Sequence, residues 1–424
     1  MLHQIDVESL GARGEAMAKA VGTCVHCGFC LPTCPTYQEL ESEMDSPRGR
    51  ILLMKSVLEG ELDCVQAAPH VDRCLGCLAC VTHCPSGVPY GDLLNSYRSH
   101  VRQQPGGQPH SMGDRLRDWL ARQTLPYPTR FRWAMRLGRA GRFFRGLMPS
   151  SLRPMLDMVP DKLPSAQRLP EFTPAAGKRR GRVALLAGCA QQVLAPDINA
   201  AAVRVLSRNG IEVVIPRGQG CCGALDWHTG HGPSASAHAR KLIDSIPSDV
   251  DYLVTTAAGC GSAIHEYPLL LVGDQQATSA KRLADRSVDI SVYLAGLDLQ
   301  PVPALKSPKR VAYHDACHLA HAQGVRHPPR DLLGRIPGLE VVDLRDGDTC
   351  CGSAGIYNIQ QPEIAEKLGR RKAQTVVETG ADTVASGNIG CLVQIEKFLK
   401  MSAPQVTVLH TVQILDRAYQ ELLD

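Results

Sequence analysis

Eight cysteines in the first 84 residues form two copies of one pattern. The first copy reads Cys24-Val-His-Cys27-Gly-Phe-Cys30-Leu-Pro-Thr-Cys34-Pro35, and the second reads Cys74-Leu-Gly-Cys77-Leu-Ala-Cys80-Val-Thr-His-Cys84-Pro85. Three thiolates at this spacing can wrap one face of a [4Fe–4S] cube, and a fourth that precedes proline can reach a neighbouring cube. The spacing therefore predicts two clusters that pass electrons.

We expect the two copies to exchange their fourth cysteines. One cluster is predicted on Cys24, Cys27, Cys30 and Cys84, and the other on Cys74, Cys77, Cys80 and Cys34. A pair of zinc sites or a set of disulfides is the alternative. It is disfavoured because zinc motifs usually hold two CxxC pairs farther apart, and because the proline recurs at the same offset in both copies.

A second cysteine pattern is duplicated in the C-terminal half of the chain. The segment RVALLAGC ends at Cys189, and RVAYHDAC ends at Cys317. Each is followed by a Cys-Cys-Gly triplet and then by a single cysteine, and matching cysteines lie 128 to 131 residues apart. Offsets this constant indicate an internal duplication that starts near residue 181.

Each half of the duplication alternates short β-branched runs with helical stretches, which predicts parallel sheets. Every cysteine of the duplication follows an expected strand, and loops beyond the carboxyl ends of parallel strands converge on one crevice. Four thiols should therefore meet in each half. The expected strands are 183–187, 212–215, 252–256, 311–314, 340–344 and 383–386, and the expected helices are 197–208 and 235–246.

The convergent thiols are candidate ligands of one or two further iron–sulfur clusters. Gly223 and Gly352, which follow the cysteine pairs, would let the backbone approach a bound group closely. The alternatives are thiols that only fill the core, or a redox-active thiol pair. The candidates are Cys189, Cys221, Cys222, Cys260, Cys317, Cys350, Cys351 and Cys391.

The elements around the first pattern predict a helical domain, with helices at 47–60, near residue 70 and at 90–102. Ser46 is the expected N-cap of the first, with Pro47 in its first turn. The fold class is α+β multidomain. We expect an α-helical ferredoxin domain over 1–110, a basic connecting segment and linker over 111–180, and two α/β cysteine-rich domains with parallel sheets over 181–305 and 306–424.

Composition narrows the class of protein. A net charge of +4, from 46 basic and 42 acidic residues, predicts no nucleic-acid partner. Seventeen cysteines, mostly in metal-type spacings, argue against a disulfide framework. The first residues do not resemble a signal peptide, and no apolar run approaches the roughly 18 residues of a membrane span. We therefore expect a cytoplasmic protein whose membrane contact, if any, is peripheral on the inner face of the plasma membrane.

Residues 130–149 read RFRWAMRLGRAGRFFRGLMP, in which arginines alternate with aromatic residues. This stretch is either a basic amphipathic helix on a membrane or partner, or a helix packed across a domain junction with its arginines solvated. Residues 160–180 have the composition of a linker.

Several other features are assigned no role in chemistry. Gly218-Gln-Gly220-Cys-Cys-Gly223 matches G-x-G-x-x-G, but only Cys-Cys-Gly recurs in the second half, which disfavours a dinucleotide site. Cys64 lies outside every motif and is expected to be a free thiol. No catalytic residue is assigned. Three histidines flank Cys317 and could tune a cluster, although lone histidines are more often structural. They are His314, His318 and His321.

Seven segments together resemble the iron–sulfur subunits of bacterial glycolate oxidase, over nearly the whole chain. They are CVHCGFCLPTCPTYQ, DSPRGRI, DRCLGCLACVTHCPSGVPY, AGCAQQVLAPDINAAAVRVL, GCCGALDWH, CCGSAGIYN and NIGCLVQ. The resemblance implies two ferredoxin-type clusters on the eight N-terminal cysteines.

The two C-terminal halves are similar to the cysteine-rich CCG domains shared with heterodisulfide reductase and anaerobic glycerol-3-phosphate dehydrogenase subunits. In heterodisulfide reductase each such domain has a fifth cysteine, in a terminal CxxC. Ala263 and Gln394 stand at that position here. A non-cubane cluster, a four-thiolate cubane and an empty site therefore all stay open.

The resemblance also implies partners. A 2-hydroxy acid gives up two electrons as a hydride, which a flavin can accept, whereas clusters pass electrons singly. We expect FAD-containing glycolate oxidase subunits in a hetero-oligomer, no flavin or NAD on this chain, and transfer to a membrane quinone or another acceptor. The alternatives are the same subunit of a D-lactate or glycerol-3-phosphate dehydrogenase, and a CCG protein that itself acts on a disulfide.

Overall fold

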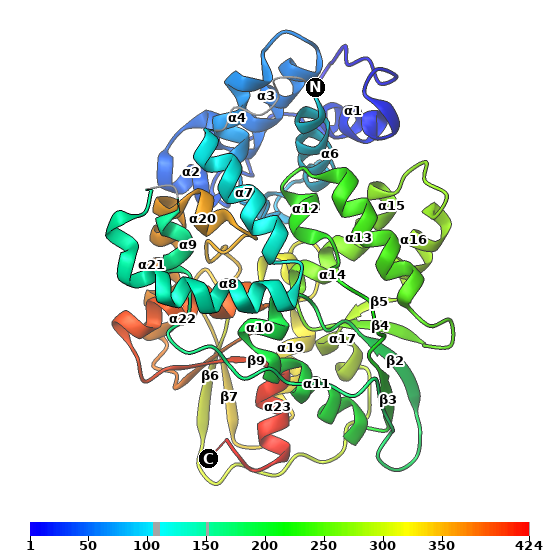
Figure 1. Ribbon diagram of the computed structural model, residues 1–424, viewed down its shortest axis with the longest axis vertical. Helices are drawn as coiled ribbons and strands as arrows, with labels where there is room; N and C mark the ends of the chain where they lie inside the picture. Colours follow the sequence, from blue (N-terminus) through cyan, green and yellow to red (C-terminus); the bar gives the residue numbers. More distant parts are fainter. Residues whose placement is uncertain (105–110, 150–151, 424) are drawn as a thin grey trace.

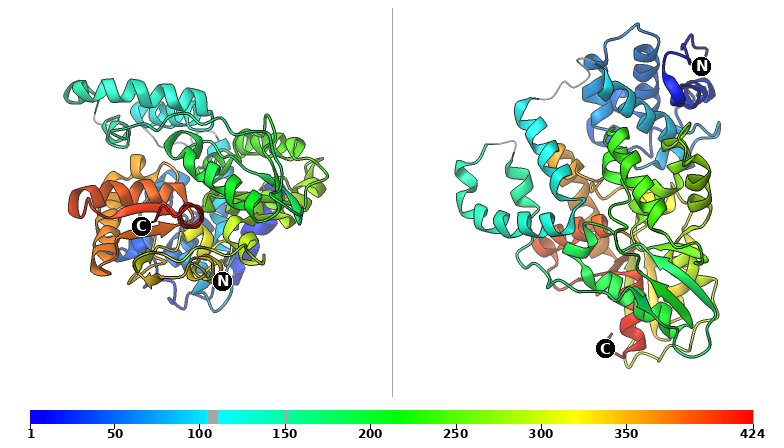
Figure 2. Two further views of the ribbon diagram at one scale, coloured as in Figure 1. Left: turned by 90° about the horizontal axis from the view of Figure 1, so that it is seen from below. Right: turned by 45° about the vertical axis from the view of Figure 1, so that its right-hand side comes forward.

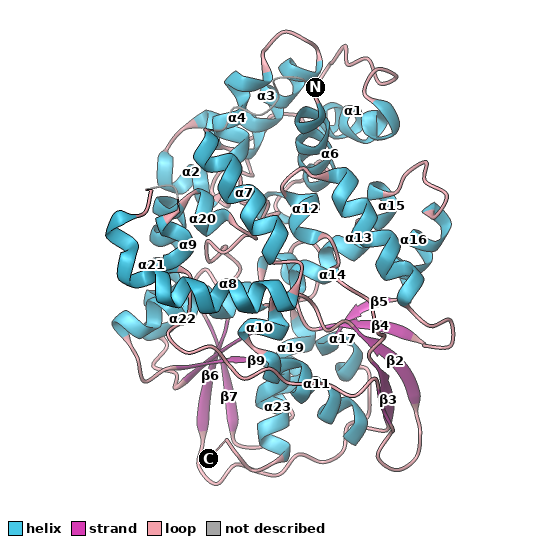
Figure 3. Cartoon of the chain, viewed as in Figure 1, coloured by secondary structure: helices cyan, strands magenta, loops and turns pink. Residues whose placement is uncertain are grey.

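The computed structural model describes residues 1–104, 111–149 and 152–423 of the chain. The helical N-terminal part lies at one end of the molecule, and two separate sheets lie toward the other end (Figure 1). Strands are confined to the sheet end, and helices surround them (Figure 3). The expected α+β class and the two domains with largely parallel sheets are confirmed.

The N-terminal part is built from short helices joined by the cysteine loops. The Ser46 hydroxyl accepts a hydrogen bond from the Gly49 N–H at 3.0 Å, and Pro47 opens the following helix, as the sequence predicts. The elements are η1 (Gly11–Arg13), α1 (Gly14–Thr23), α2 (Pro35–Leu40), η2 (Glu43–Asp45), α3 (Pro47–Leu58), α4 (Cys64–Asp72), α5 (Ala79–Thr82) and α6 (Tyr90–Gln103).

This part has its own apolar core. Met17 from α1, Met54 from α3 and Leu93 from α6 are fully buried against one another's helices. Cys24 follows α1 directly, Cys34 precedes α2 and Cys74 follows α4 within two residues. The core therefore fixes the helix ends from which the cysteine loops start.

The connecting segment is more ordered than its composition predicts. It forms α7 (Met112–Thr124), α8 (Pro128–Gly141), η3 (Arg142–Leu147) and α9 (Arg153–Asp157) along one side of the molecule (Figure 2). The basic stretch 130–149 is helical, but α8 gives way to η3 at residue 142. The expected linker contributes β1 (Phe172–Thr173), which pairs antiparallel with β3 at the edge of the first sheet. The expected linker thus includes one short edge strand.

The duplication appears as two sheets with the same strand order. The first sheet runs β1-β3-β2-β4-β5 and the second β7-β6-β8-β9, and all pairs except β1–β3 are parallel. The strands are β2 (Gly181–Leu185), β3 (Ile211–Val214), β4 (Tyr252–Thr255), β5 (Ser287–Asp289), β6 (Lys309–Tyr313), β7 (Leu339–Asp343), β8 (Thr383–Ser386) and β9 (Thr407–His410). All six strands expected from the sequence are present, within two residues at either end.

Helices cover both sheets. Those of the first half are α10 (Gln191–Leu194), α11 (Pro196–Arg208), α12 (Ala224–His228), α13 (Gly232–Ser245), α14 (Ala258–His265), α15 (Tyr267–Leu270), α16 (Ala277–Asp285) and α17 (Ile290–Ala295). Those of the second half are α18 (Cys317–Ala320), α19 (His327–Gly334), α20 (Tyr357–Gln360), α21 (Pro362–Glu378), α22 (Ile389–Ser402) and α23 (Thr411–Tyr419).

The two halves of the duplication share one apolar core. Val183 and Leu206 of the first half belong to the same buried cluster as Val311 and Leu415 of the second. Helices α11 and α23 pack against each other across this boundary. Burial of apolar surface from both halves holds the two sheets in a fixed relation. Among the described residues, no helix is long and apolar enough to cross a membrane.

Candidate iron–sulfur sites

The two N-terminal cysteine loops share a backbone conformation. His26 and Gly28 of the first loop, and Gly76 and Leu78 of the second, all have positive φ, between 56° and 88°. They stand at matching positions, two and four residues after the first cysteine of each copy. For His26 and Leu78 this conformation costs about 1–3 kcal/mol each, which is typical of functional loops. The repeat of positive φ at matching positions indicates that both loops are shaped in the same way to present thiols.

The structure brings Cys84 to the first loop. A small cavity is lined by the sulfur-bearing residues Cys24, Cys27, Cys30, Cys80 and Cys84. Burial raises the pKa of Cys24, and the charges of Cys84 and Cys27 raise it further. Burial likewise raises the pKa of Cys30 to about 11.

The second loop gathers around Cys34 of the first. Burial raises the pKa of Cys80 well above its ordinary value, and the charges of Cys77, Cys74 and Cys34 raise it further. The pKa of Cys77 is raised well above its ordinary value in the same way, by burial first. Buried thiols so close together hold their protons unless cationic iron compensates for the thiolate charge. The donor set therefore fits the clusters that the spacing predicts.

A buried ion pair supports Cys34. Arg50 is 1% exposed and donates from Nη2 to Asp45 Oδ1 at 3.3 Å and from Nη1 to Thr36 Oγ1 at 2.9 Å. The same Nη1 lies 3.8 Å from Cys34 Sγ. Asp45 Oδ2 also contacts Arg73 Nη1 at 3.3 Å. Both members of the buried pair therefore have hydrogen-bond partners, which a buried charge requires.

Cys74 differs from the other thiols of its loop. Burial alone would raise its pKa, but the charges of Arg50 and Arg98, with hydrogen bonds from Tyr90 and the Gly76 N–H, hold the pKa of Cys74 below its ordinary value. Arginine charge beside a cysteine stabilises the thiolate, which is the form that binds metal. The sequence reasoning did not single out Arg50 or Arg98.

The duplicated cysteines form two matching rows. Cys221 Sγ lies 3.6 Å from Cys189 Sγ, and the row continues through Cys222 to Cys260. The second row runs through Cys317, Cys350, Cys351 and Cys391 in the same order. The expected convergence of four thiols in each half is therefore present in the structure.

The glycine after each cysteine pair is required by close packing. Gly223 and Gly352 have φ of 80° and 88°. A Cβ at Gly223 would lie 3.0 Å from the Ala235 carbonyl oxygen, and one at Gly352 would lie 2.8 Å from the Ala365 carbonyl oxygen. Glycine is therefore required at both positions because the backbone of a helix lies against it. The sequence predicted a different reason, the close approach of the backbone to a bound group.

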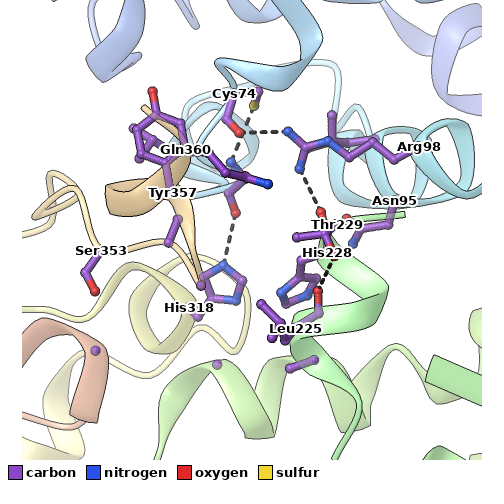
Figure 4. A pocket seen from close by; sticks show the side chains of 18 of the residues that line it. Cys74, Asn95, Arg98, Leu225, His228, Thr229, His318, Ser353, Tyr357 and Gln360 are labelled. Atoms are coloured by element: carbon purple, nitrogen blue, oxygen red, sulfur yellow. Dashed lines mark hydrogen bonds between the residues drawn. The ribbon is translucent and has the colours of Figure 1, made fainter. Parts of the chain in front are cut away.

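Both rows line one central cavity of about 560 Å³, which also reaches Cys74. Figure 4 shows Cys74 and Arg98 from the N-terminal part on one side, with His228 and His318 from the two halves of the duplication below them. The ring centroids of His228 and His318 lie 5.0 Å apart. Cys64, at the start of α4, also lines this cavity.

The second N-terminal loop packs directly on the second row. Cys77, Cys317 and Cys350 belong to one buried cluster with Leu75 and Ala79. His318 Nε2 lies 3.1 Å from the Gly76 carbonyl oxygen, and Tyr357 donates to the Arg73 carbonyl oxygen at 2.9 Å. These contacts hold the second loop directly against one wall of the second row.

The first row meets the N-terminal part through α6. Arg98 Nη1 donates to the His228 carbonyl oxygen at 2.9 Å, and Arg98 Nη2 donates to the Cys74 carbonyl oxygen at 2.8 Å. Asn95 donates to Glu266 Oε2 at 2.8 Å. A single arginine thus joins the second N-terminal loop to the first half of the duplication (Figure 4).

Comparison with known proteins agrees with this division of the chain. Residues 20–88 match the 4Fe-4S dicluster domain family, and residues 183–265 and 311–396 each match the cysteine-rich domain family. The fold and the sites therefore define a multi-cluster iron–sulfur protein of the electron-transfer class, with two ferredoxin-type motifs and two CCG domains.

Relatives extend over the full chain. The glycolate oxidase iron-sulfur subunit of Escherichia coli (strain K12) is 36% identical over 97% of both chains. The probable glycolate oxidase iron-sulfur subunit of Bacillus subtilis (strain 168) is 36% identical over 88% of both. A fumarate reductase (CoM/CoB) subunit of Methanothermobacter marburgensis is 28% identical over 95% of this chain and 73% of its own. The chain belongs to the family of glycolate oxidase iron–sulfur subunits, and so is a subunit of an oxidoreductase complex.

The two arginines on Asp45 provide a matched test of the buried ion pair. Arg50→Gln should lower the free energy of unfolding of the N-terminal part by about 3–5 kcal/mol, because it removes a buried partner of Asp45. Arg73→Gln should cost less than about 1 kcal/mol, since the Arg73 side chain is 37% exposed. Urea unfolding of the anaerobic protein, followed by circular dichroism, measures both. Equal losses would contradict the argument from burial.

Proposed function

We propose that this chain conducts electrons during the oxidation of glycolate to glyoxylate, from a flavin on a partner subunit to a membrane quinone or another acceptor. The observation that carries the proposal is that each set of cysteines lies beside the next. Cys34 of the first loop is close enough to raise the pKa of Cys80 in the second, and Cys77 of the second loop packs in one buried cluster with Cys317 and Cys350. When bound, iron–sulfur clusters at these cysteines would accept and release single electrons.

The proposed division of labour follows from the chemistry of the substrate. Glycolate loses a hydride and a proton as its C–H and O–H bonds break and the carbonyl of glyoxylate forms. A flavin takes up the two electrons and returns them one at a time, and a quinone would collect two electrons and two protons. The chain's role is to hold its carriers close together within the protein. The partners that we propose for this role are FAD-containing subunits in a hetero-oligomer.

The ligand sets that we propose are those expected from the spacing. Four cysteines for one cluster are Cys24, Cys27, Cys30 and Cys84, and four for the other are Cys74, Cys77, Cys80 and Cys34. Cys84 lines one small cavity together with Cys24, Cys27 and Cys30, which supports the exchange for the first cluster. The two rows of the duplication are proposed to hold further clusters with four thiolates each.

The domain boundaries also stay a proposal. The separate core of the N-terminal part supports a unit that ends near residue 110, a position outside the described residues. The common core of the duplication favours one rigid body for 181–305 and 306–424, each with its own sheet.

Helices α8 and η3 together carry a surface of arginines and exposed apolar side chains. This surface is our candidate for membrane contact on the inner face of the plasma membrane. Phe143 is 90% exposed and Leu147 85%, while Phe144, Trp133 and Leu137 are also exposed. Arg136 lies over the Trp133 ring at 5.0 Å. Exposed aromatic and aliphatic side chains among arginines are typical of helices that lie in the headgroup region of a bilayer.

Reduction by substrate tests the proposed function. Anaerobically purified chain with its co-purifying flavoprotein should show cluster bleaching in visible absorption when glycolate is added, with weaker bleaching by D-lactate. Bleaching by glycerol-3-phosphate alone would assign the chain to a different flavin dehydrogenase. Reduction by a thiol pair without the flavoprotein would instead favour a CCG protein that acts on disulfides.

Serine variants test the exchange of the fourth cysteines. Cys34→Ser and Cys84→Ser should each deplete one cluster, with a loss of about four iron atoms per chain where assembly fails. Double variants are decisive: Cys34→Ser with Cys77→Ser should lose no more iron than Cys77→Ser alone. Cys64→Ser is the control and should retain all iron. Additive losses in the double variant would show that Cys34 belongs to the other cluster.

Vesicle binding tests the membrane surface. Phe143→Ser with Phe144→Ser should weaken sedimentation with anionic vesicles at least about tenfold, because each buried phenylalanine contributes about 1.5–3 kcal/mol. Met401→Ser, which alters another exposed apolar residue on α22, is the control. Unchanged vesicle binding by the phenylalanine variant would refute the membrane contact.

A further inference from the structure

The two halves of the duplication differ beside their cysteine rows. Leu186 stands three residues before Cys189, whereas His314 stands three residues before Cys317. Both side chains are buried, with exposures of 2% and 0%. The first half is therefore apolar at a position where the second half has an imidazole.

A second difference lies on the helix that follows each cysteine pair. The carbonyls of Ala235 and Ala365 contact the equivalent glycines, so they mark matching positions on α13 and α21. Seven residues later the first half has Leu242 and the second has Lys372. Both side chains are buried. The second site thus carries two nitrogen groups that the first lacks.

His314 is aimed at the sulfur atoms. One of its ring nitrogens and the Sγ atoms of Cys351 and Cys391 all lie within 4.8 Å of one another. Nδ1 lies 2.9 Å from the Gly347 carbonyl oxygen, and since a carbonyl oxygen only accepts, Nδ1 carries the hydrogen. Nε2 then has a free lone pair, and this buried atom has no hydrogen-bond partner among the residues that the structure describes.

Lys372 contacts the same stretch of backbone that fixes this imidazole. Lys372 Nζ donates to the Asp346 and Gly347 carbonyl oxygens, the second of which also accepts from His314. Neutral imidazole with a fixed Nδ1–H is the form that binds transition metals through Nε2.

The residue at the absent fifth cysteine cannot supply this ligand. Gln394 Oε1 accepts from Asn358 Nδ2 at 3.3 Å, and its Nε2 donates to the Ala365 carbonyl oxygen at 3.1 Å. Both polar ends of the side chain are therefore occupied away from the metal. In the first half the same position is Ala263, which has no donor atom.

We propose that His314 Nε2 is a nitrogen ligand of the iron centre in the second cysteine-rich domain, in addition to Cys317, Cys350, Cys351 and Cys391. The proposal rests on the cluster-binding role proposed above for these four cysteines. The first domain, with leucine at this position, then holds its iron by thiolates alone. The two halves of the duplication are thereby different in ligand chemistry, although their backbones match.

Pulsed electron paramagnetic resonance of protein carrying nitrogen-15-labelled histidine tests the ligand. The anaerobic protein is measured both oxidised and dithionite-reduced. A strong nitrogen-15 coupling should appear on one cluster signal and disappear in His314→Leu. His314→Cys should abolish the coupling and retain the iron content, because a thiolate replaces the imidazole. His321→Gln is the control, since both ring nitrogens of His321 have other partners, and it should retain the coupling.

Variants of the matching cysteines assign the coupling to its domain. Cys351→Ser should abolish it together with its cluster signal, and Cys222→Ser should retain it. A coupling that survives His314→Leu, or its absence in both oxidation states, overturns the proposal. Failure of the cluster-binding role is distinguishable, because Cys351→Ser would then leave both the iron content and the signals unchanged.

Discussion

The crowding of buried thiols is the constraint on which the other features of this structure depend. Burial raises the pKa of these thiols, and the negative charge of each neighbouring thiolate raises it further. Iron relieves this cost where it binds, and protein cations relieve part of it. The charge of Arg50 lowers the pKa of Cys74 in the second N-terminal loop, and Lys372 lies beside the second row of the duplication. The charge of bound iron is therefore part of the folded state of this protein.

The scaffold meets this constraint by fixing each loop at both ends. Helix termini hold the N-terminal loops, and strand ends hold the duplicated rows. The core common to both sheets then sets the distance between the two rows. Arg98, with donors to the backbone of Cys74 and of His228, connects this rigid pair to the N-terminal part. The arrangement of the cysteines thus results from the helix and strand ends, the shared apolar core and the Arg98 hydrogen bonds.

The sequence predicted the features that repeat. Two copies of each cysteine pattern predicted the metal class, the duplication and six strands, because spacing and periodicity are local properties. It missed β5 and β9, which have three and four residues, and β1, which lies in a segment of linker composition. Arg50 and Lys372 also escaped prediction, since a single charge in a helix has no local signal of burial. His314 was noted but left without a role, because only the tertiary structure places one of its ring nitrogens beside two sulfur atoms.

The exchange of Cys34 and Cys84 between loops bears on how the chain matures during synthesis. With the proposed ligand sets, the cluster that includes Cys34 has all its cysteines only after residue 80 has left the ribosome, and the other only after residue 84. The first loop alone would offer three ligands to one cube and one to another that does not yet exist. Iron insertion therefore follows synthesis of both loops, and the two clusters are completed as a unit. Oxidative loss of one cluster would likewise free a cysteine of the loop that holds the other, so damage and repair of the pair are coupled.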